Sequence, residues 1–189
     1  LVISTPGIVQ IMKHLGKIAP FDRAQLPHWN ELDTAYTNLP YDTSGLYYFP
    51  YTYGTSGITY NSEKIAGPLT SAWELWNPRY AGRILLFDDM IETIGLGCRL
   101  AGGSLSQRDP ALLARAVDLL KKQKVLLRKY DASTMRELLE SGDAWITPMY
   151  NGHAVRVMRG DKRMVYYIPK EGTFFWVDNI CLLADAPHK

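Results

Sequence analysis

The sequence predicts an α/β protein with a mostly parallel sheet and flanking helices. Short apolar runs typical of buried strands alternate with segments that have helical periodicity along most of the 189 residues. Apolar residues make up 47% of the chain and charged residues 21%, a composition typical of a soluble globular protein. This length is sufficient for one large domain or for two small lobes with separate cores.

The first third of the chain contains two strand-like segments separated by loops. Residues 1–5 (LVIST) form a short buried-strand pattern, and the next segment, PGIVQIMKHLGK, predicts a helix that begins at Pro6 and stops at Gly16. Residues 18–46 are rich in Pro, Asn and Asp and predict loops. Residues 45–61 alternate aromatic, small and β-branched side chains, which predicts extended chain interrupted at Pro50 and Gly54.

The rest of the chain alternates helices with strands more regularly. A short helix and a turn are expected within residues 71–82, followed by a strand at 83–87. Asp109 and Pro110 indicate the start of a helix, and Thr134 with Glu137 matches a capping box. The basic residues within 121–129 are typical of a solvated helix end. In order, the expected elements are helices at 89–101, 109–123 and 133–142, a strand at 144–150, a helix at 152–159, and strands at 164–169 and 174–183.

Several functional classes have little support in the composition. The formal net charge is +2, so the chain has no strong electrostatic signature of nucleic-acid binding. No apolar run approaches the roughly 20 residues of a membrane span. Cys98 and Cys181 do not form a metal-binding pattern, and we expect two buried free thiols. The chain starts in mid-strand and has no visible signal peptide, so we interpret it as an internal piece of a longer protein.

The segment FDDMIE at residues 87–92 is the most informative candidate site. Ligands of α/β proteins bind beyond the carboxyl ends of the strands. Four stretches are expected at such ends, and three of them contain an acidic or aromatic residue: STP (4–6), DDMIE (88–92), YNG (150–152) and WVD (176–178).

Different chemistries compete for the acids of this segment. Asp89 and Glu92 have the spacing of a capping box, in which each side chain bonds the backbone N–H of the other residue. A metal site is disfavoured because the four histidines are scattered. Residues 95–103 lack the spacing of a nucleotide-binding glycine motif, and the chain has no nucleophile elbow of the G-x-S-x-G type. We therefore expect neither a metal, a cofactor nor catalysis.

Capture of an organic cation is the remaining interpretation. Paired carboxylates attract an alkylammonium group and accept its hydrogen bonds, while Trp and Tyr rings add cation–π attraction. Asp178, two residues after Trp176, is expected to supply a second anionic end for a diamine or polyamine. The start of a helix disfavours a cation by about 0.3–1 kcal/mol, which Asp88, Asp89 and Glu92 together must outweigh.

Four segments of the chain resemble the substrate-binding proteins of bacterial spermidine/putrescine ABC transporters. FPYTYGTSGITYNSEKI resembles the aromatic segment at which that family crosses between lobes. SAWELWNPRYAGRILLFDDMIE resembles its S-W-x-x-L-W…G…L-x-D-D-x-x-E run, and PMYNG resembles a W-N-G segment. IPKEGTFFWVDNICLLADA resembles its P-K-E-G-x-x-F-W-x-D…A run.

The resemblance implies a two-lobed periplasmic binding protein-like II fold with an incomplete first lobe. Residues 1–52 and 169–189 are then parts of lobe one, residues 53–168 form lobe two, and Cys98 and Cys181 lie in different lobes. By the same resemblance Tyr150 replaces a stacking Trp, and Gly7 falls where the family commonly has a Tyr. The expected ligand-binding residues are Asp89, Glu92, Trp176, Asp178, Tyr150, Thr5, Tyr53 and Ser133.

The expected function is therefore binding and transport. The resemblance implies a periplasmic protein, or an extracellular lipoprotein, that binds a polyamine and delivers it to the permease of an ABC transporter. Its precursor is expected to carry a signal peptide. Two alternatives remain open: another cargo on the same fold, such as an amino-acid derivative, an opine-like compound or an iron complex, and an enzyme that uses the acids as a general acid/base pair.

Overall fold

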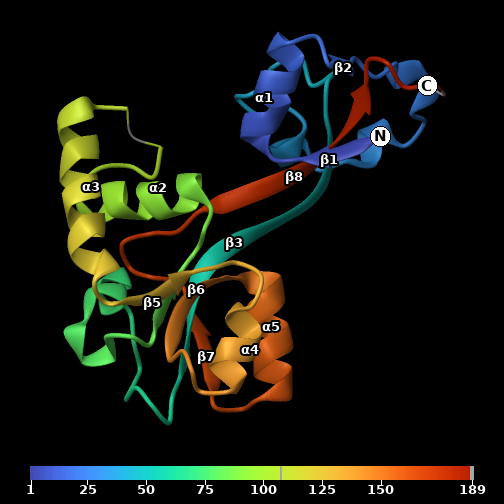
Figure 1. Cartoon of the computed structure of the whole chain (residues 1–189). Helices are drawn as coiled ribbons and strands as arrows, with labels where there is room; N and C mark the ends of the chain where they lie inside the picture. The colour runs from blue at the N-terminus through green and yellow to red at the C-terminus, as the bar shows by residue number, and fades with distance from the viewer. Residues whose placement is uncertain (107, 188–189) are drawn as a thin grey trace. The chain divides into compact units, whose positions relative to one another are not determined.

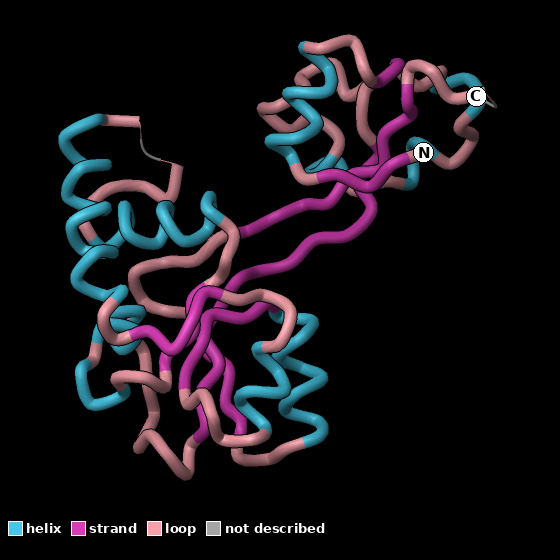
Figure 2. Tube along the Cα trace, in the orientation of Figure 1, coloured by secondary structure: helices cyan, strands magenta, loops and turns pink. Residues whose placement is uncertain are grey.

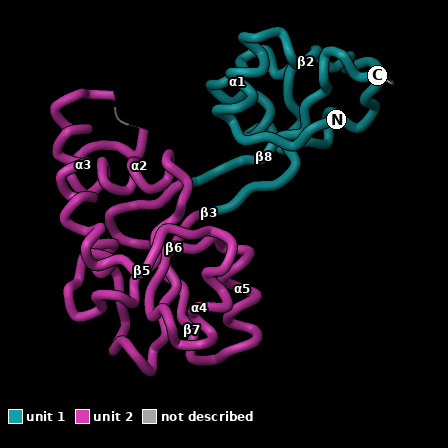
Figure 3. Tube along the Cα trace, in the orientation of Figure 1, with its two compact units in different colours: residues 1–54, 175–189 teal, residues 55–174 magenta. Residues whose placement is uncertain are grey.

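The computed structural model describes residues 1–106 and 108–187, which divide into two compact units (Figure 3). Unit 1 consists of residues 1–54 and 175–189, and unit 2 consists of residues 55–174. The chain thus passes between the units twice, after residue 54 and after residue 174. The lobe borders expected from the sequence, after residues 52 and 168, stay a prediction.

Unit 1 is organised around strand β8 (Phe175–Leu183). Strands β1 (Val2–Ser4) and β2 (Ile18–Ala19) both pair antiparallel with β8, and helix α1 (Pro6–His14) connects them. Alternate residues of β8 are buried, as expected for a strand with one face on a core. The buried residues of its main hydrophobic cluster are Val9, Ile18, Tyr48 and Cys181.

Residues 20–48 of unit 1 form the predicted loop-rich segment. It contains three single-turn 3₁₀-helices, η1 (Arg23–Gln25), η2 (Trp29–Glu31) and η3 (Thr34–Tyr36). The buried Asp42 carboxylate holds the end of this segment, because it accepts hydrogen bonds from Lys13 Nζ at 2.7 Å and from backbone N–H groups of residues 44, 46 and 47.

Unit 2 contains a mixed five-stranded sheet in the order β7-β3-β6-β4-β5. Strand β3 pairs antiparallel with β6 and β7, whereas β4 pairs parallel with β5 and β6. The sheet is therefore mixed rather than mostly parallel, because the long strand β3 runs against its neighbours. The strands are β3 (Phe49–Asn61), β4 (Ile84–Leu86), β5 (Leu127–Tyr130), β6 (Ile146–Tyr150) and β7 (Met164–Tyr167).

Helices cover both faces of this sheet (Figures 1 and 2). On one face lie α2 (Met90–Leu100) and α3 (Pro110–Lys124), which pack against each other. On the other lie α4 (Met135–Glu140) and α5 (Asn151–Gly160). Strand β4 is buried on both faces: its first and third residues join the core under α2 and α3, and its second joins the core under α4 and α5. The predicted α/β architecture is present.

Two strands differ from the sequence prediction. Strand β3 continues through Pro50 and Gly54 without interruption, although each residue usually weakens a strand. Residues 127–129, which were expected at a solvated helix end, instead belong to the parallel strand β5, which follows the end of α3 at Lys124. This strand lies at the end of the sheet order, and short, charged strands are common at sheet edges.

Two predicted helix starts also differ in detail. Thr134 precedes α4 without forming the expected capping box with Glu137, because the Thr134 hydroxyl bonds Asp131 instead. The short helix expected within residues 71–82 consists of two 3₁₀-helices, η4 (Ala72–Trp76) and η5 (Pro78–Tyr80). The cap at Asp109 is present, since its side chain accepts from Ala111 N–H at 3.1 Å.

A glycine in helix α2 permits close packing next to the candidate site, and its replacement tests the fold. A Cβ at Gly95 would lie 2.3 Å from Phe174 Cζ and 2.6 Å from Leu105 O. We predict that Gly95→Ala lowers the free energy of unfolding by about 1–3 kcal/mol, the usual cost of overpacking. Urea unfolding followed by circular dichroism measures it.

Gly152→Ala is the matched control for this experiment. Gly152 lies in α5, and a Cβ there would have no atom within 4 Å. This substitution is expected to leave stability unchanged or to raise it by up to about 1 kcal/mol through helix propensity. Equal stability of the two variants would contradict the close packing of Phe174 and Leu105 on α2.

Candidate functional site

Asp89 lies between the buried strand β4 and helix α2 and starts that helix. It is the N-cap residue, and its Oδ1 accepts a hydrogen bond from Glu92 N–H at 2.9 Å. This is one half of the predicted capping box. Asp89 is exposed to solvent, so its carboxylate remains accessible to a ligand.

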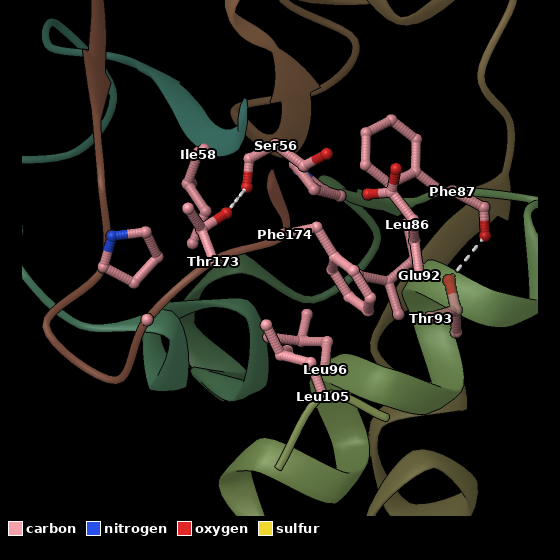
Figure 4. Close-up of a pocket in the computed structure, with 14 residues that line it drawn as sticks. Ser56, Ile58, Leu86, Phe87, Glu92, Thr93, Leu96, Leu105, Thr173 and Phe174 are labelled. Carbon is pink, nitrogen blue, oxygen red and sulfur yellow. Dashed lines mark hydrogen bonds between the residues drawn. The ribbon is translucent and has the colours of Figure 1, made fainter. Parts of the chain in front are cut away.

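Glu92 does not complete the capping box. Its side chain extends from α2 toward Ser56 on β3 and is largely buried (Figure 4). Its Oε2 is buried and has no hydrogen-bond partner among the described residues. Burial, followed by the negative charge of Asp89, raises the pKa of Glu92 to about 7, although the nearby hydroxyls of Ser56 and Tyr150 act in the opposite direction.

The space around Glu92 is a small pocket within unit 2. Its polar lining includes Ser56, Glu92 and Thr93, and most of the rest is apolar. Thr93 is already paired, because its hydroxyl donates to Phe87 O at 2.8 Å. Phe174 and Leu96 belong to this apolar lining (Figure 4). The internal volume of about 30 Å³ is enough for one or two water-sized groups.

Tyr150 provides an aromatic wall next to this carboxyl group. It ends strand β6, and its ring stacks on Phe87 with centroids 4.7 Å apart and an interplanar angle of 18°. His153 contacts the same ring edge-on at 6.1 Å. Burial raises the pKa of Tyr150, and the charges of Glu92, Asp89 and Asp88 add to the shift. The parallel pairing of β4 with β6 therefore brings Tyr150 to the predicted acids.

Asp88 is the third acid of the segment and is exposed. Together with Asp89 and Tyr130 it lines an open groove at the start of α2. Its charge contributes to the raised pKa of Tyr150, which places it within electrostatic range of the Glu92 site. We therefore regard Asp88 as a source of negative potential in unit 2.

Ser133 lies in the turn after β5. Its backbone N–H and its hydroxyl both donate to Asp131 Oδ1, at 2.6 and 3.0 Å. Burial opposes ionisation of Asp131, but hydrogen bonds from Lys129, Thr134 and Ser133 hold the pKa of this carboxyl well below its usual range. Ser133 is exposed and its position is fixed by Asp131, but no described hydrogen bond joins it to the Glu92 pocket.

Unit 1 brings together three of the residues that were expected to bind ligand. Trp176 and Asp178 lie on the same face of β8, since side chains alternate along a strand. Ser4 pairs with Asn179, so the next residue, Thr5, lies beside Asp178 at the start of α1. Asp178 is half-buried, and burial raises its pKa.

Tyr53 belongs to an aromatic group of unit 1 that includes two residues not expected from the sequence. Its ring stacks on Tyr36 with centroids 4.9 Å apart and lies 5.8 Å from Phe175. Tyr53 and Phe175 are exposed. Tyr36 comes from a loop that carried no sequence signal, so only the folded structure places it against Tyr53.

A model of the family "Bacterial extracellular solute-binding protein" matches residues 2–189. The chain belongs to this family. A spermidine/putrescine-binding periplasmic protein of Haemophilus influenzae is 29% identical over 182 residues, which are 95% of this chain and 50% of that protein. The chain spans about half the length of the curated relatives it matches.

Solved structures of this solute-binding family share the fold. A putative spermidine/putrescine ABC transporter protein of Listeria monocytogenes matches 97% of this chain and 57% of its own, with 28% identity and a TM-score of 0.89. The spermidine/putrescine substrate-binding protein PotD of Streptococcus pneumoniae matches 96% of this chain and 56% of its own, with 26% identity and a TM-score of 0.83. The predicted binding-protein fold and family are thus confirmed, and these relatives are solute-binding proteins rather than enzymes.

The structure also bears on the cysteines, on possible metal ligands and on membrane-spanning helices. Cys98 and Cys181 are buried free thiols, as predicted. Among residues 1–106 and 108–187, no group of three or more potential ligands is arranged for a metal, and no helix is long and apolar enough to cross a membrane. Sequence reasoning missed Ser56, because its T-S-G context fits an ordinary strand.

The raised pKa of Glu92 predicts how stability depends on pH in the absence of ligand. Between the ordinary carboxyl pKa of 4.5 and the folded value of about 7, the folded state binds more protons than the unfolded state. Stability should therefore fall as pH rises through this window and level off above it. The expected loss is roughly 1–3 kcal/mol, at the lower end where solvent screens the carboxyl.

Denaturant unfolding at pH 5 and pH 8 measures this loss in the wild type and in Glu92→Gln. The variant should lose the Glu92 contribution to the slope and gain stability at pH 8. Glu137→Gln, which replaces an exposed acid on α4, serves as the control. An unchanged slope in Glu92→Gln would show that the Glu92 carboxyl is ionised normally.

Proposed function

We propose that this chain is the central part of an extracytoplasmic solute-binding protein that captures a polyamine or a related amine. In this proposal it has no enzymatic activity and delivers its cargo to the permease of an ABC transporter. It acts in the periplasm or as a membrane-anchored lipoprotein, with a signal peptide on its precursor. The named relatives support this proposal, since their names describe spermidine/putrescine binding or transport.

The observation that carries the proposal is the buried carboxyl group of Glu92. Its Oε2 has no partner among the described residues, and the exposed acids Asp88 and Asp89 lie at the same strand end. Burying a carboxylate without a counter-charge is costly, and a cationic ligand removes that cost. An ammonium group would gain charge-assisted hydrogen bonds from the acids and attraction from the face of Tyr150.

In the proposed site the predicted residues have separate roles. Asp89, Glu92 and Tyr150 hold one ammonium end, and Ser133 lies near the same end of the sheet. Trp176 and Asp178, with Thr5 beside them, take another part of the cargo, and Tyr53 adds an aromatic surface. In this proposal residues 1–52 and 169–189 belong to lobe one of the binding protein, and residues 53–168 form lobe two.

Charge-neutralising substitutions in the intact protein test the proposed function. Asp89→Asn and Glu92→Gln are each expected to weaken spermidine or putrescine binding by about 10- to 100-fold, because each removes a charge-assisted hydrogen bond. Asp178→Asn is expected to have a similar effect. Asn is a good N-cap, so Asp89→Asn removes the charge without removing the start of α2. Isothermal titration calorimetry gives the affinities.

Asp118→Asn is the matched control, because Asp118 is an exposed acid on α3 whose ion-pair distance to Lys121 is 4.0 Å. Its affinity for both amines should equal that of the wild type. Unchanged affinity in both Asp89→Asn and Asp178→Asn would contradict the proposal. Thermal-shift measurements with amino acids and metal complexes would then test the alternative cargoes.

A further inference from the structure

Residues 169–174 form a loop that closes part of the pocket around Glu92. The loop follows strand β7 and is neither helix nor strand. It contributes four residues to the lining of the pocket: Pro169, Gly172, Thr173 and Phe174. Because the loop has no ladder of its own, individual hydrogen bonds and packing contacts set its position.

The carboxylate of Glu171 fastens this loop to the start of the 3₁₀-helix η4. Ser71, the N-cap residue of η4, donates its hydroxyl to Glu171 Oε1 at 2.6 Å, and the Ala72 N–H donates to Oε2 at 2.9 Å. We call these two hydrogen bonds the Glu171 anchor. The Lys170 N–H supports it by donating to Thr70 O at 2.8 Å. Both oxygens of one side chain thus hold the loop to a distant part of the sequence.

This anchor requires a carboxylate. Burial opposes ionisation of Glu171, but the hydrogen bonds from the Ser71 hydroxyl and the Ala72 N–H lower its pKa below the usual value. A carboxylate accepts from both donors, whereas a glutamine amide has one acceptor oxygen and presents N–H groups on its other side. Glu171→Gln therefore breaks at least one of the two bonds with little change in shape.

Helix α2 and strand β3 also bind the loop. Arg99, in the last turn of α2, donates from Nε to Glu171 O. The Thr173 hydroxyl donates to Ser56 O on β3 (Figure 4), and the Ser56 N–H donates to Phe174 O at 3.1 Å. The loop is thus bonded to η4, to α2 and to β3, and the last two elements carry other residues of the pocket.

Phe174 connects the loop to the burial of Glu92. A Cβ at Gly95 would lie 2.3 Å from Phe174 Cζ, so the ring packs directly on α2. Glu92 and Gly95 are three residues apart and are therefore neighbours on one side of that helix. Burial is the main cause of the raised pKa of Glu92. Release of the loop from η4 would admit water beside the Glu92 carboxyl.

From this geometry we propose that Glu171 is a positioning residue for the Glu92 pocket: its carboxylate fastens residues 169–174 to η4 and so keeps water away from Glu92. Glu171 acts through the loop and not by contact with the cargo. The effect on cargo binding rests on the proposed function, whereas the closure of the pocket is a property of unit 2 alone.

The ionisation of Glu92 measures this closure without any ligand. NMR titration of the Glu92 side-chain carboxyl in the intact protein compares the wild type with Glu171→Gln. We expect the pKa of Glu92 to fall from about 7 by roughly one pH unit or more in the variant, toward the ordinary 4.5, because water enters the pocket. Amide hydrogen exchange of Ser56, whose acceptor lies in the loop, should become about tenfold faster.

Two substitutions of Ser71 weaken and restore the anchor without changing the charge of Glu171. Ser71→Ala removes the hydroxyl donor and should also lower the pKa of Glu92. Ser71→Thr keeps a hydroxyl and a good N-cap, so it should retain the wild-type pKa. An unchanged pKa of Glu92 in both Glu171→Gln and Ser71→Ala would overturn the inference. Thermal melts establish which variants are folded, and the Ser71 pair decides the test if Glu171→Gln is not.

Glu74→Gln is the matched control for the lost charge. Burial raises the pKa of Tyr167, and the charges of Glu74 and Glu171 both add to the shift, so the two acids lie in the same neighbourhood. The described hydrogen bonds of Glu74 come from its own segment, from Asn77 and Tyr80. An equal fall of the Glu92 pKa in Glu74→Gln would assign the effect to charge and overturn the inference.

Calorimetry with putrescine connects the anchor to cargo binding. Glu171→Gln should bind putrescine about three- to tenfold more weakly than the wild type, the effect of one lost hydrogen bond, and Glu74→Gln should bind it equally well. Unchanged affinity in Glu171→Gln would overturn the positioning role in binding and leave the proposed function intact. Failure of the wild type to bind any amine would overturn the proposed function, while the pKa of Glu92 still decides the role of Glu171.

Discussion

The hydrogen bond from Glu92 N–H to Asp89 Oδ1 is the constraint on which the geometry of the site depends. It makes Asp89 the N-cap and Glu92 the third residue of helix α2. Since successive residues of an α-helix are rotated by about 100°, a helix that began one residue later would turn Glu92 away from strand β3. The same bond uses one oxygen of Asp89 and leaves the exposed carboxylate able to act as a charge. The N-cap hydrogen bond of Asp89 thus directs the Glu92 side chain inward and leaves the Asp89 carboxylate exposed.

The groups that face Glu92 come from regular elements. Ser56 lies on β3, Tyr150 ends β6, and Phe87 follows β4. Antiparallel pairing sets Ser56 opposite Tyr150, and parallel pairing brings the end of β6 next to that of β4. Sites built on strands and helices hold their side chains more precisely than sites on loops, which favours a defined position for these three groups around Glu92.

Local sequence signals predicted the elements, but they did not decide the direction of Glu92. The D-x-x-E spacing correctly indicated a cap at Asp89, yet it fits equally a Glu92 that returns to the backbone and one that points inward. The direction of the Glu92 side chain depends on Ser56 and Tyr150. These two residues are distant in sequence and become neighbours only in the folded sheet. The same limit explains Thr134, whose spacing to Glu137 predicted a capping box but whose hydroxyl instead bonds the buried Asp131. Strand β5 was missed because its charged residues, typical of a sheet edge, also fit a helix end.

Two opposing effects act on the pKa of Glu92: burial and the charge of Asp89 raise it, whereas the start of helix α2 lowers it. The start of a helix stabilises a carboxylate by about 0.3–1 kcal/mol and disfavours a cation by a similar amount. Burial and the charge of Asp89 outweigh this stabilisation, since the pKa of Glu92 rises to about 7. Because this pKa lies far above the ordinary carboxyl value, a proton and an ammonium group compete for the same carboxyl. A carboxyl that regains a proton when cargo leaves avoids an unpaired buried charge. In the proposed function this competition lowers the net affinity for an amine as pH falls.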